Sequence, residues 1–311
     1  MKSIFRGLAF GAALVTAIST RGITQSEYRN MEGGRPVRVS DASPTELHGL
    51  DLDLTTVRVD KLSFGRYRLQ VEPRLSYGIR PRADISIRTL GFYREPSAIP
   101  RGTIAGIGIG GEYQVKMETL RSPALALAGE VWAPTGPNAS VPSYSLKGLA
   151  TRSFTFGRVH LNASYGTYSI KIPVPPPGGT LIPPIVDGPC MMSPSDGGLS
   201  PRASCSTSFG VPLSLQQAAA LKPGTNTGAH WLWGVAVDHS FPLRSLLLIG
   251  DVFSEGFEGL GRRNDWTAEV GARKQLTTRL VTDLSVGRHF EGVSLSWFAT
   301  FGTTLSYAFG R

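Results

Sequence analysis

The histidines are the side chains of this chain most suited to proton transfer. No G-x-S-x-G or H-E-x-x-H motif accompanies any of the five, which are His48, His160, His230, His239 and His289. His160 and Asn162 would share one face of a strand, but spacing alone does not supply the third member of a Ser/His/Asn triad. We therefore expect no enzymatic activity and no cofactor. A lipid-modifying enzyme is the alternative to that expectation.

Charged residues recur at every second position in several segments. In residues 63–79, arginines and a glutamate alternate with Tyr67, Leu69, Val71 and Leu75. Charges that face an interior need partners, so we expect a network between strands. It either fills a narrow interior or lines a path for a substrate. Its predicted members are Arg66, Arg68, Glu72, Arg74, Arg88, Glu112, Glu130, Asp251, Glu269, Arg273 and Asp283.

Residues 106–111, GIGIGG, satisfy the pattern G-x-G-x-x-G. A dinucleotide site needs this motif between a strand and a helix, whereas here the next residues, GEYQV, continue the strand pattern. The alternation instead places Ile107 and Ile109 outward and glycines inward, where they leave space for another segment. The aromatics Phe92, Trp132, Phe253 and Phe298 are also predicted to face inward, either as structural filling or as an apolar path.

The two cysteines, Cys190 and Cys205, lie in one polar, proline-rich segment. In an exported protein such a pair is typical of a disulfide. No histidine lies nearby, so we do not expect a metal site.

The elements that would position these residues are long strands. Residues 295–309 place Leu295, Trp297, Phe301 and Phe309 on one face, with small or hydroxylated residues between them. A period of two predicts a strand, and about 15 residues suit a tilted membrane-crossing strand. Similar rows recur along the chain and predict an all-β fold, a single antiparallel up-and-down transmembrane β-barrel of about 12 strands. We place the strands at 46–58, 61–79, 84–93, 103–116, 123–133, 146–155, 158–170, 229–241, 245–255, 264–275, 280–289 and 294–309.

Short and long connections alternate between these strands. Short turns are expected near 80–83, 117–122, 156–158, 242–244 and 276–279, and these belong to the periplasmic rim. The longest connection, residues 171–228, would be an extracellular loop closed by Cys190 and Cys205, with a helix over 214–222. It either folds over the pore or is a surface loop without a gating role.

The N-terminus has the pattern of a secretory signal. Lys2 and Arg6 precede a short apolar run over 7–18 and small residues, which predicts a signal peptide over 1–19. Residues 20–45 are polar and without a strong period. We predict a periplasmic N-terminal segment there, which could partly enter the barrel, and a barrel over 46–311.

Composition agrees with this organisation. Only 18% of the residues are charged, and 37 glycines and 22 prolines suit a turn-rich β-protein. No apolar run of about 18 residues predicts a membrane helix. The net charge of +9 comes from arginines spread over strands and turns, with no basic stripe, so we expect no nucleic-acid partner.

Several segments together resemble one family. They are LSYGIRPRADISI (75–87), PALALAGEVWAPTG (123–136), VHLNASYGTY (159–168), WLWGVAVDHSFPLRSLLLIGDVF (231–253) and LSYAF (305–309). The sequence is similar to the outer-membrane transporters named for the meta-pathway of phenol degradation. The resemblance implies an outer-membrane barrel that moves hydrophobic aromatic compounds, and it supplies no site residues. The terminal strand is also similar to the signal read by barrel-assembly machinery, although Gly310 and Arg311 follow Phe309.

The sequence therefore predicts a channel or transporter for small, hydrophobic or aromatic solutes in the outer membrane of a Gram-negative-type bacterium. Its expected partners are outer-membrane lipid, the barrel-assembly machinery and the solute. The alternative from another class is a structural or interaction protein that presents the 171–228 loop to a partner outside the cell.

Overall fold

A computed structural model describes residues 30–31, 35–54, 56–61, 67–95, 101–133, 142–172, 190–193, 202–206, 212–213, 224–258, 264–291 and 297–309. Arg66, the signal peptide and the helix predicted over 214–222 lie outside these ranges. The strands of the barrel are β1 (Gly49–Asp53), β2 (Val57–Lys61), β3 (Tyr67–Val71), β4 (Arg74–Arg80), β5 (Ala83–Glu95), β6 (Arg101–Lys116), β7 (Ala124–Ala133), β8 (Ser143–Phe154), β9 (Gly157–Ile172), β13 (Gly224–Phe241), β14 (Leu246–Phe257), β15 (Asp265–Gln275), β16 (Leu280–Glu291) and β17 (Trp297–Ala308).

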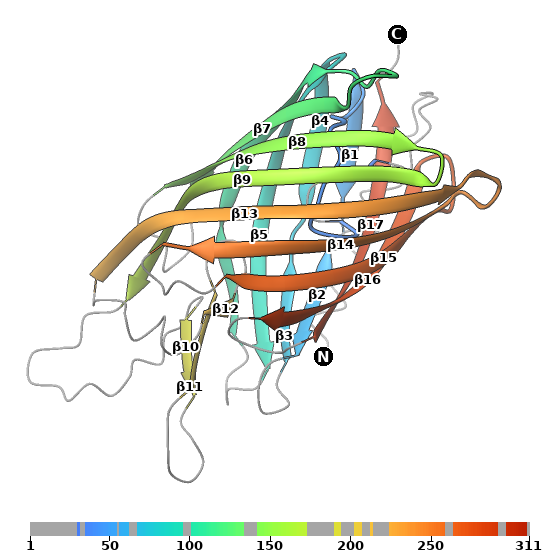
Figure 1. Cartoon of the computed structure of the whole chain (residues 1–311). Coiled ribbons are helices and arrows are strands. Elements are labelled where there is room, and N and C mark those ends of the chain that lie inside the picture. Colours follow the sequence, from blue (N-terminus) through green and yellow to red (C-terminus); the bar gives the residue numbers. More distant parts are fainter. Residues whose placement is uncertain are drawn as a thin grey trace, which may run out of the picture.

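The sheet closes into a barrel of 12 antiparallel strands, as predicted. The last strand, β17, pairs with β16 on one side and with both β1 and β2 on the other. In this closing seam Gly49 lies opposite Ala308, and Asp60 lies opposite Phe298. In Figure 1 the strands β13–β16 cross in front of β2–β5 at a steep angle, as expected for the tilted strands of a barrel.

The first two predicted strands are each interrupted. The predicted strand 46–58 corresponds to β1 and β2, and the predicted strand 61–79 to β3 and β4. Pro73 has no N–H to donate to a ladder, and its carbonyl oxygen instead accepts a hydrogen bond from the Thr89 amide at 3.1 Å. The chain resumes the same barrel position in each case, because β2 and β3 pair with each other and β1 pairs with β4.

The alternation of side chains follows the sequence pattern. On β17, Trp297 and Phe301 are 43% and 47% exposed, whereas Phe298 and Thr300 are buried inside. Ile107 and Ile109 on β6 are likewise exposed. A protein whose apolar residues point away from its interior presents them to lipid.

Tryptophans gather on the outer surface of the strands β13 and β15. The rings of Trp233 and Trp266 meet edge to face at a centroid distance of 4.9 Å. They can do so because the residue between them in the register is the small Ser254. On the neighbouring pair, Trp231 covers Gly256, where an added Cβ would lie 2.2 Å from the ring. Large amphipathic rings at such positions suit a membrane interface.

The connections alternate in length around the two rims. The predicted short turns are confirmed, among them residues 81–82 and the 3-10 turn Pro242–Arg244. The longest connection is shorter than predicted, because β9 continues to Ile172 and β13 begins at Gly224. Within it a separate sheet is formed by β10 (Cys190–Ser193), β11 (Arg202–Ser206) and β12 (Pro212–Leu213). Figure 1 places this sheet beyond the rim opposite the C-terminus.

This closed barrel with an apolar outer surface is an outer-membrane protein of a Gram-negative bacterium. Among the described residues, no helix is long and apolar enough to span a bilayer.

The placement of residues 20–45 in the periplasm is wrong for the part that the structure describes. Residues 35–45 lie inside the barrel, where Val37, Val39 and Ala42 are fully buried. The physical reason is that the barrel interior carries both apolar contacts and hydrogen-bonding side chains for this segment. The prediction that it could enter the barrel is confirmed for these residues, which we call the plug (residues 35–45).

Candidate functional site

The plug crosses the barrel near the rim that carries the short turns and touches opposite walls. Its backbone amides donate to side chains on four different strands. The Val39 amide donates to Asp251 on β14 at 3.0 Å, and the Ser40 amide to Asn162 on β9 at 2.9 Å. The contact with Asn162 is reciprocal, because its side-chain amide donates to the Ser40 carbonyl at 2.7 Å.

The remaining amides reach the wall in the same way. Ala42 donates to the Thr151 hydroxyl on β8, and Thr45 donates to the Asp84 carboxylate on β5, each at 2.9 Å. Buried amides need acceptors, and here polar side chains of the wall supply them. The plug is thus held by side chains and adds no strand to the barrel sheet.

Apolar contacts fix the plug at two places. At one, aliphatic side chains from β13, β14 and β16 enclose the plug and Met31, four residues before Arg35. This cluster consists of Met31, Val37, Val39, Ala236, Leu247, Ile249 and Val281. At the other, Ala42 packs against Ala124, Ala126 and Leu149 on β7 and β8. Small alanines on the inward face leave the room that the plug backbone needs.

Arg35 is the main electrostatic anchor of the plug. Its guanidinium is buried and bonds Asp53 on β1 and Asp283 on β16, the latter at 3.2 Å, and it donates to the Thr304 hydroxyl at 2.7 Å. Arg273 on β15 donates to the Arg35 carbonyl at 3.3 Å. A buried cation is tolerated only when it is paired and hydrogen-bonded, and these groups meet that requirement.

A closed circuit of hydrogen bonds holds the next part of the plug. The Thr151 hydroxyl, which accepts from Ala42, lies 3.0 Å from His160 Nδ1, and His160 Nε2 lies 3.2 Å from Asp238. Asp238 pairs with Arg158 at 2.6 Å. Arg158 returns to the plug, where it meets the Asp41 carboxylate at 3.5 Å. Burial raises the pKa of Asp41, against the lowering effect of Arg158.

This circuit also shows the surroundings of His160, the candidate catalytic residue of the sequence. A hydroxyl, a histidine and an aspartate in series resemble a nucleophilic triad. However, the Thr151 oxygen already accepts the Ala42 amide, and His160 is completely buried. Asn162, which shares its face, binds Ser40 and takes no part. The arrangement attaches the plug to the wall. No group of His, Cys, Asp or Glu side chains within the described ranges is arranged to hold a metal ion.

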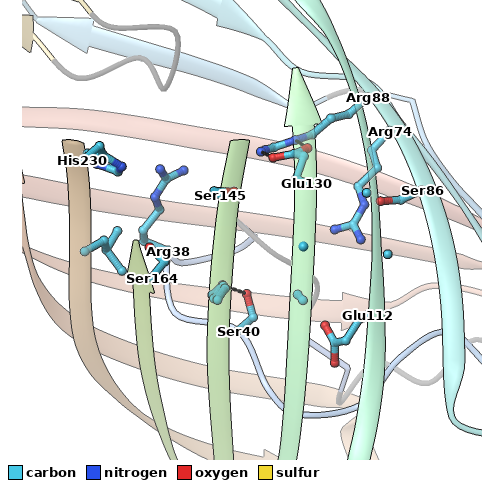
Figure 2. A pocket seen from close by; sticks show the side chains of 16 residues that line it. Arg38, Ser40, Arg74, Ser86, Arg88, Glu112, Glu130, Ser145, Ser164 and His230 are labelled. Carbon is cyan, nitrogen blue, oxygen red and sulfur yellow. Dashed lines mark hydrogen bonds and ion pairs between the residues drawn. The ribbon is translucent and has the colours of Figure 1, made fainter. Parts of the chain in front are cut away.

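A cavity of about 140 Å³ lies in the middle of the barrel, with the plug residues Arg38 and Ser40 in its lining (Figure 2). Polar and charged side chains make up most of that lining. They come from β4 to β9 and from β13, and they include Arg74, Ser86, Arg88, Glu112, Glu130, Ser145, Lys147, Ser164 and His230.

Arg88 forms the most connected group at this cavity. It bonds both Glu130 on β7 and Glu72, which follows β3. Its guanidinium lies 4.8 Å from the centre of the Trp132 ring, a favourable cation–π distance. The ring in turn lies on Gly108, where an added Cβ would sit 2.9 Å from it. The inward glycines thus make room for wall side chains, not for a loop.

The same combination of glycine, aromatic ring and arginine occurs on the far wall. The Phe298 ring lies over Gly287, with an added Cβ only 2.2 Å away. Arg58 lies 3.6 Å from the centre of that ring and bonds Asp60 at 2.8 Å. These aromatics therefore support arginines, which makes structural filling a better description than an apolar path. The side chain of Phe92 lies outside the described part.

Every predicted lining residue that the structure describes belongs to the lumen. Arg68, Asp251, Glu269, Arg273 and Asp283 are buried there. Arg74, Arg88, Glu112 and Glu130 line the central cavity, and Glu72 lines a smaller one beside it. The predicted set of lumen residues did not include plug residues and several wall partners, namely Arg35, Arg38, Asp41, Asp53, Asp60, Lys147 and Asp238, and His160 was considered only for catalysis. The missed wall residues could have been found from the alternation of their strands, which places them on the inner face.

Comparison with known proteins gives likeness in fold alone. No protein-family model and no curated protein sequence matches this chain. Among solved structures, it is similar to an outer membrane channel from Pseudomonas putida F1 (11% identity, TM-score 0.47, 83% of this chain and 94% of that one). It is also similar to the KdgM porin in complex with oligogalacturonate (9% identity, TM-score 0.46, 84% and 99%). A third is the CymD monoaromatic hydrocarbon channel (8% identity, TM-score 0.36, 86% and 90%).

Proposed function

We propose that this protein is an outer-membrane channel for small solutes, without enzymatic activity, and that its plug closes the periplasmic end. The observation that carries the proposal is how the plug is held. Its bonds to the wall end on side chains such as Asp251, Asn162 and Thr151. Releasing it breaks none of the hydrogen bonds of the barrel ladder, so the wall stays intact when the lumen opens.

The join between plug and wall is suited to this role. The His48 amide donates to the Gly78 carbonyl at 2.8 Å, and Leu47 bridges to the same residue. From Gly49 onward the chain belongs to β1. Detachment of the plug would therefore pivot next to Glu46, with Leu47, His48 and the strand beyond them fixed to the wall.

The proposal also includes the class of solute. The family resemblance implies hydrophobic or aromatic compounds, whereas the described lining of the central cavity is mainly polar. A solute that combines a small apolar body with a polar group fits both observations. Uptake of such compounds by cells with and without the protein tests this point.

A covalent lock tests the gate directly. Ser40→Cys and Asn162→Cys, introduced together, place thiols on two neighbouring residues, because the Asn162 side chain bonds both the amide and the carbonyl of the Ser40 backbone. With the disulfide verified by mass, we expect planar bilayers to show little conductance, and a reductant to restore it. Ser40→Cys alone is the control. A locked protein that conducts as well as the control would refute the gate.

The second candidate is an interaction protein that presents the long loop to an external partner. It is favoured by the loop having its own sheet, β10–β12. Deleting residues 175–226 separates the two functions. Loss of partner binding with intact permeability supports this candidate, and loss of permeability supports a gating role of the loop.

A further inference from the structure

The charges around the central cavity are not evenly matched. Its lining contains four cationic side chains and two carboxyl groups, the latter Glu112 and Glu130; the cations are Arg38, Arg74, Arg88 and Lys147. They come from the plug and from three strands of the wall. In Figure 2 the labelled arginines and Glu112 surround a common space.

Two of these cations are neutralised by acids. Arg88 bonds Glu130 and Glu72. Arg38 pairs with Glu255 on β14 at 3.3 Å. Neither Glu72 nor Glu255 belongs to the lining of the central cavity, so these partners hold the arginines from outside it.

Lys147 is different. Within the described part of the chain, its ammonium donates to the Ser40 hydroxyl at 2.7 Å and forms no salt bridge. The dashed line at Ser40 in Figure 2 marks this bond. An ammonium group away from bulk water gains much more from a carboxylate than from a neutral hydroxyl. Among the described residues, the Glu112 carboxylate attracts this ammonium across the cavity but forms no salt bridge with it. Lys147 can therefore still bond an anionic oxygen directly.

We infer that the central cavity binds a small monocarboxylate, whose carboxylate group bonds Lys147 at the boundary between wall and plug. The volume of about 140 Å³ is close to that of a cavity of roughly 150 Å³ that holds benzene. Leu232 and Ala128 provide apolar lining for the body of such a ligand. Glu112, which lines the same cavity, opposes a second negative charge.

The position of the site links the ligand to the plug. A carboxylate that bonds Lys147 competes with the Ser40 hydroxyl and removes one of the bonds that hold the plug. The binding site follows from the cavity and its charges. Only the consequence for opening rests on the proposed channel function.

The test is equilibrium binding of benzoate to the full-length protein in detergent, measured by isothermal titration calorimetry at neutral pH and moderate salt. Benzamide is the neutral probe of the same shape, and benzylamine is the cationic one. We expect benzoate to bind about tenfold or more tightly than either. Equal binding of benzamide, or a preference for benzylamine, would overturn the inference.

Variants test whether Lys147 is the cation that binds the carboxylate of benzoate. Lys147→Met should weaken benzoate binding roughly 10- to 100-fold, the usual value of a hydrogen bond to a charged group. Lys147→Arg should restore most of it. Lys116→Met is the matched control, because it removes the same charge from the exposed end of β6. If Lys147→Met binds benzoate as the native protein does, or if Lys116→Met loses it equally, the inference is wrong.

The two proposals fail separately. Benzoate binding without conductance in planar bilayers would refute the channel and leave the site standing. Conductance without benzoate binding would refute the site and leave the channel standing.

Discussion

The plug should be released by replacing its electrostatic anchor, in the variant Arg35→Met. Arg35 is 3% exposed and neutralises Asp53 and Asp283. Methionine keeps much of the volume and removes the charge, so Asp53 loses its salt bridge with Arg35, and Asp283 keeps only the longer contact with Arg273 at 3.5 Å. Breaking a buried pair in this way costs about 3–5 kcal/mol.

This cost falls on the attached state of the plug, since the carboxylates gain water when the plug leaves. Each 1.4 kcal/mol is a factor of ten in an equilibrium. The ratio of released to attached plug should therefore rise by roughly two to three and a half orders of magnitude. The barrel should remain folded, because its ladder is untouched.

Amide hydrogen exchange measures this ratio directly. The amides of Val39, Ser40, Ala42 and Thr45 are protected by wall side chains, so they should exchange faster by about the same factor. Bilayer conductance should rise in parallel. The control is Arg58→Met, which removes the same charge from the lumen wall at a residue that bonds Asp60. If plug amides in Arg35→Met exchange at the native rate, Arg35 is not the anchor and the reasoning fails.

Three further outcomes are expected. Gly287→Ala should lower the free energy of unfolding by about 1–3 kcal/mol through overpacking against Phe298, while Gly250→Ala, whose new Cβ meets no atom within 3.5 Å, should not; chemical denaturation in detergent measures both. Thr151→Val should leave the Ala42 amide without its acceptor, and its exchange should rise roughly tenfold. The two cysteines, which are register partners in β10 and β11, should resist alkylation until a reductant is added; reaction without reductant would contradict the disulfide.

The barrel could be predicted from the sequence because its signal is local. On β17 the type of each residue indicates whether its side chain faces the lipid or the lumen. The alternation of Trp297 and Phe301 with Thr300 and Thr304 can therefore be recognised without knowing any distant contact. Closure follows from the same pattern at the first and last strands. The predicted strand 61–79 is interrupted at Pro73, because proline has no N–H for the ladder although the alternation of side chains continues through it.

The partners inside the barrel could be predicted only as a set. Alternation places Glu72, Arg88 and Glu130 on the inner face, but their pairing depends on register between β3, β5 and β7. A shift of two residues would preserve every inward side chain and change every salt bridge. The sequence therefore predicted these three members of the network and left the connections between them open.

The sequence left undecided whether residues 35–45 enter the barrel, although the inner face of the barrel strands contained a signal for the plug. A polar inner face suits water and a peptide equally well, since both satisfy hydrogen bonds. Aliphatic residues on that face cannot form hydrogen bonds, and Leu247, Ile249 and Val281 form an inward belt at one level of the barrel. Water cannot form hydrogen bonds with such a belt, whereas Val37 and Val39 pack against it and bury their apolar surface. Inward aliphatics at one level of a barrel, combined with a polar segment before the first strand that carries Val37 and Val39, therefore predict a plug of the chain's own sequence.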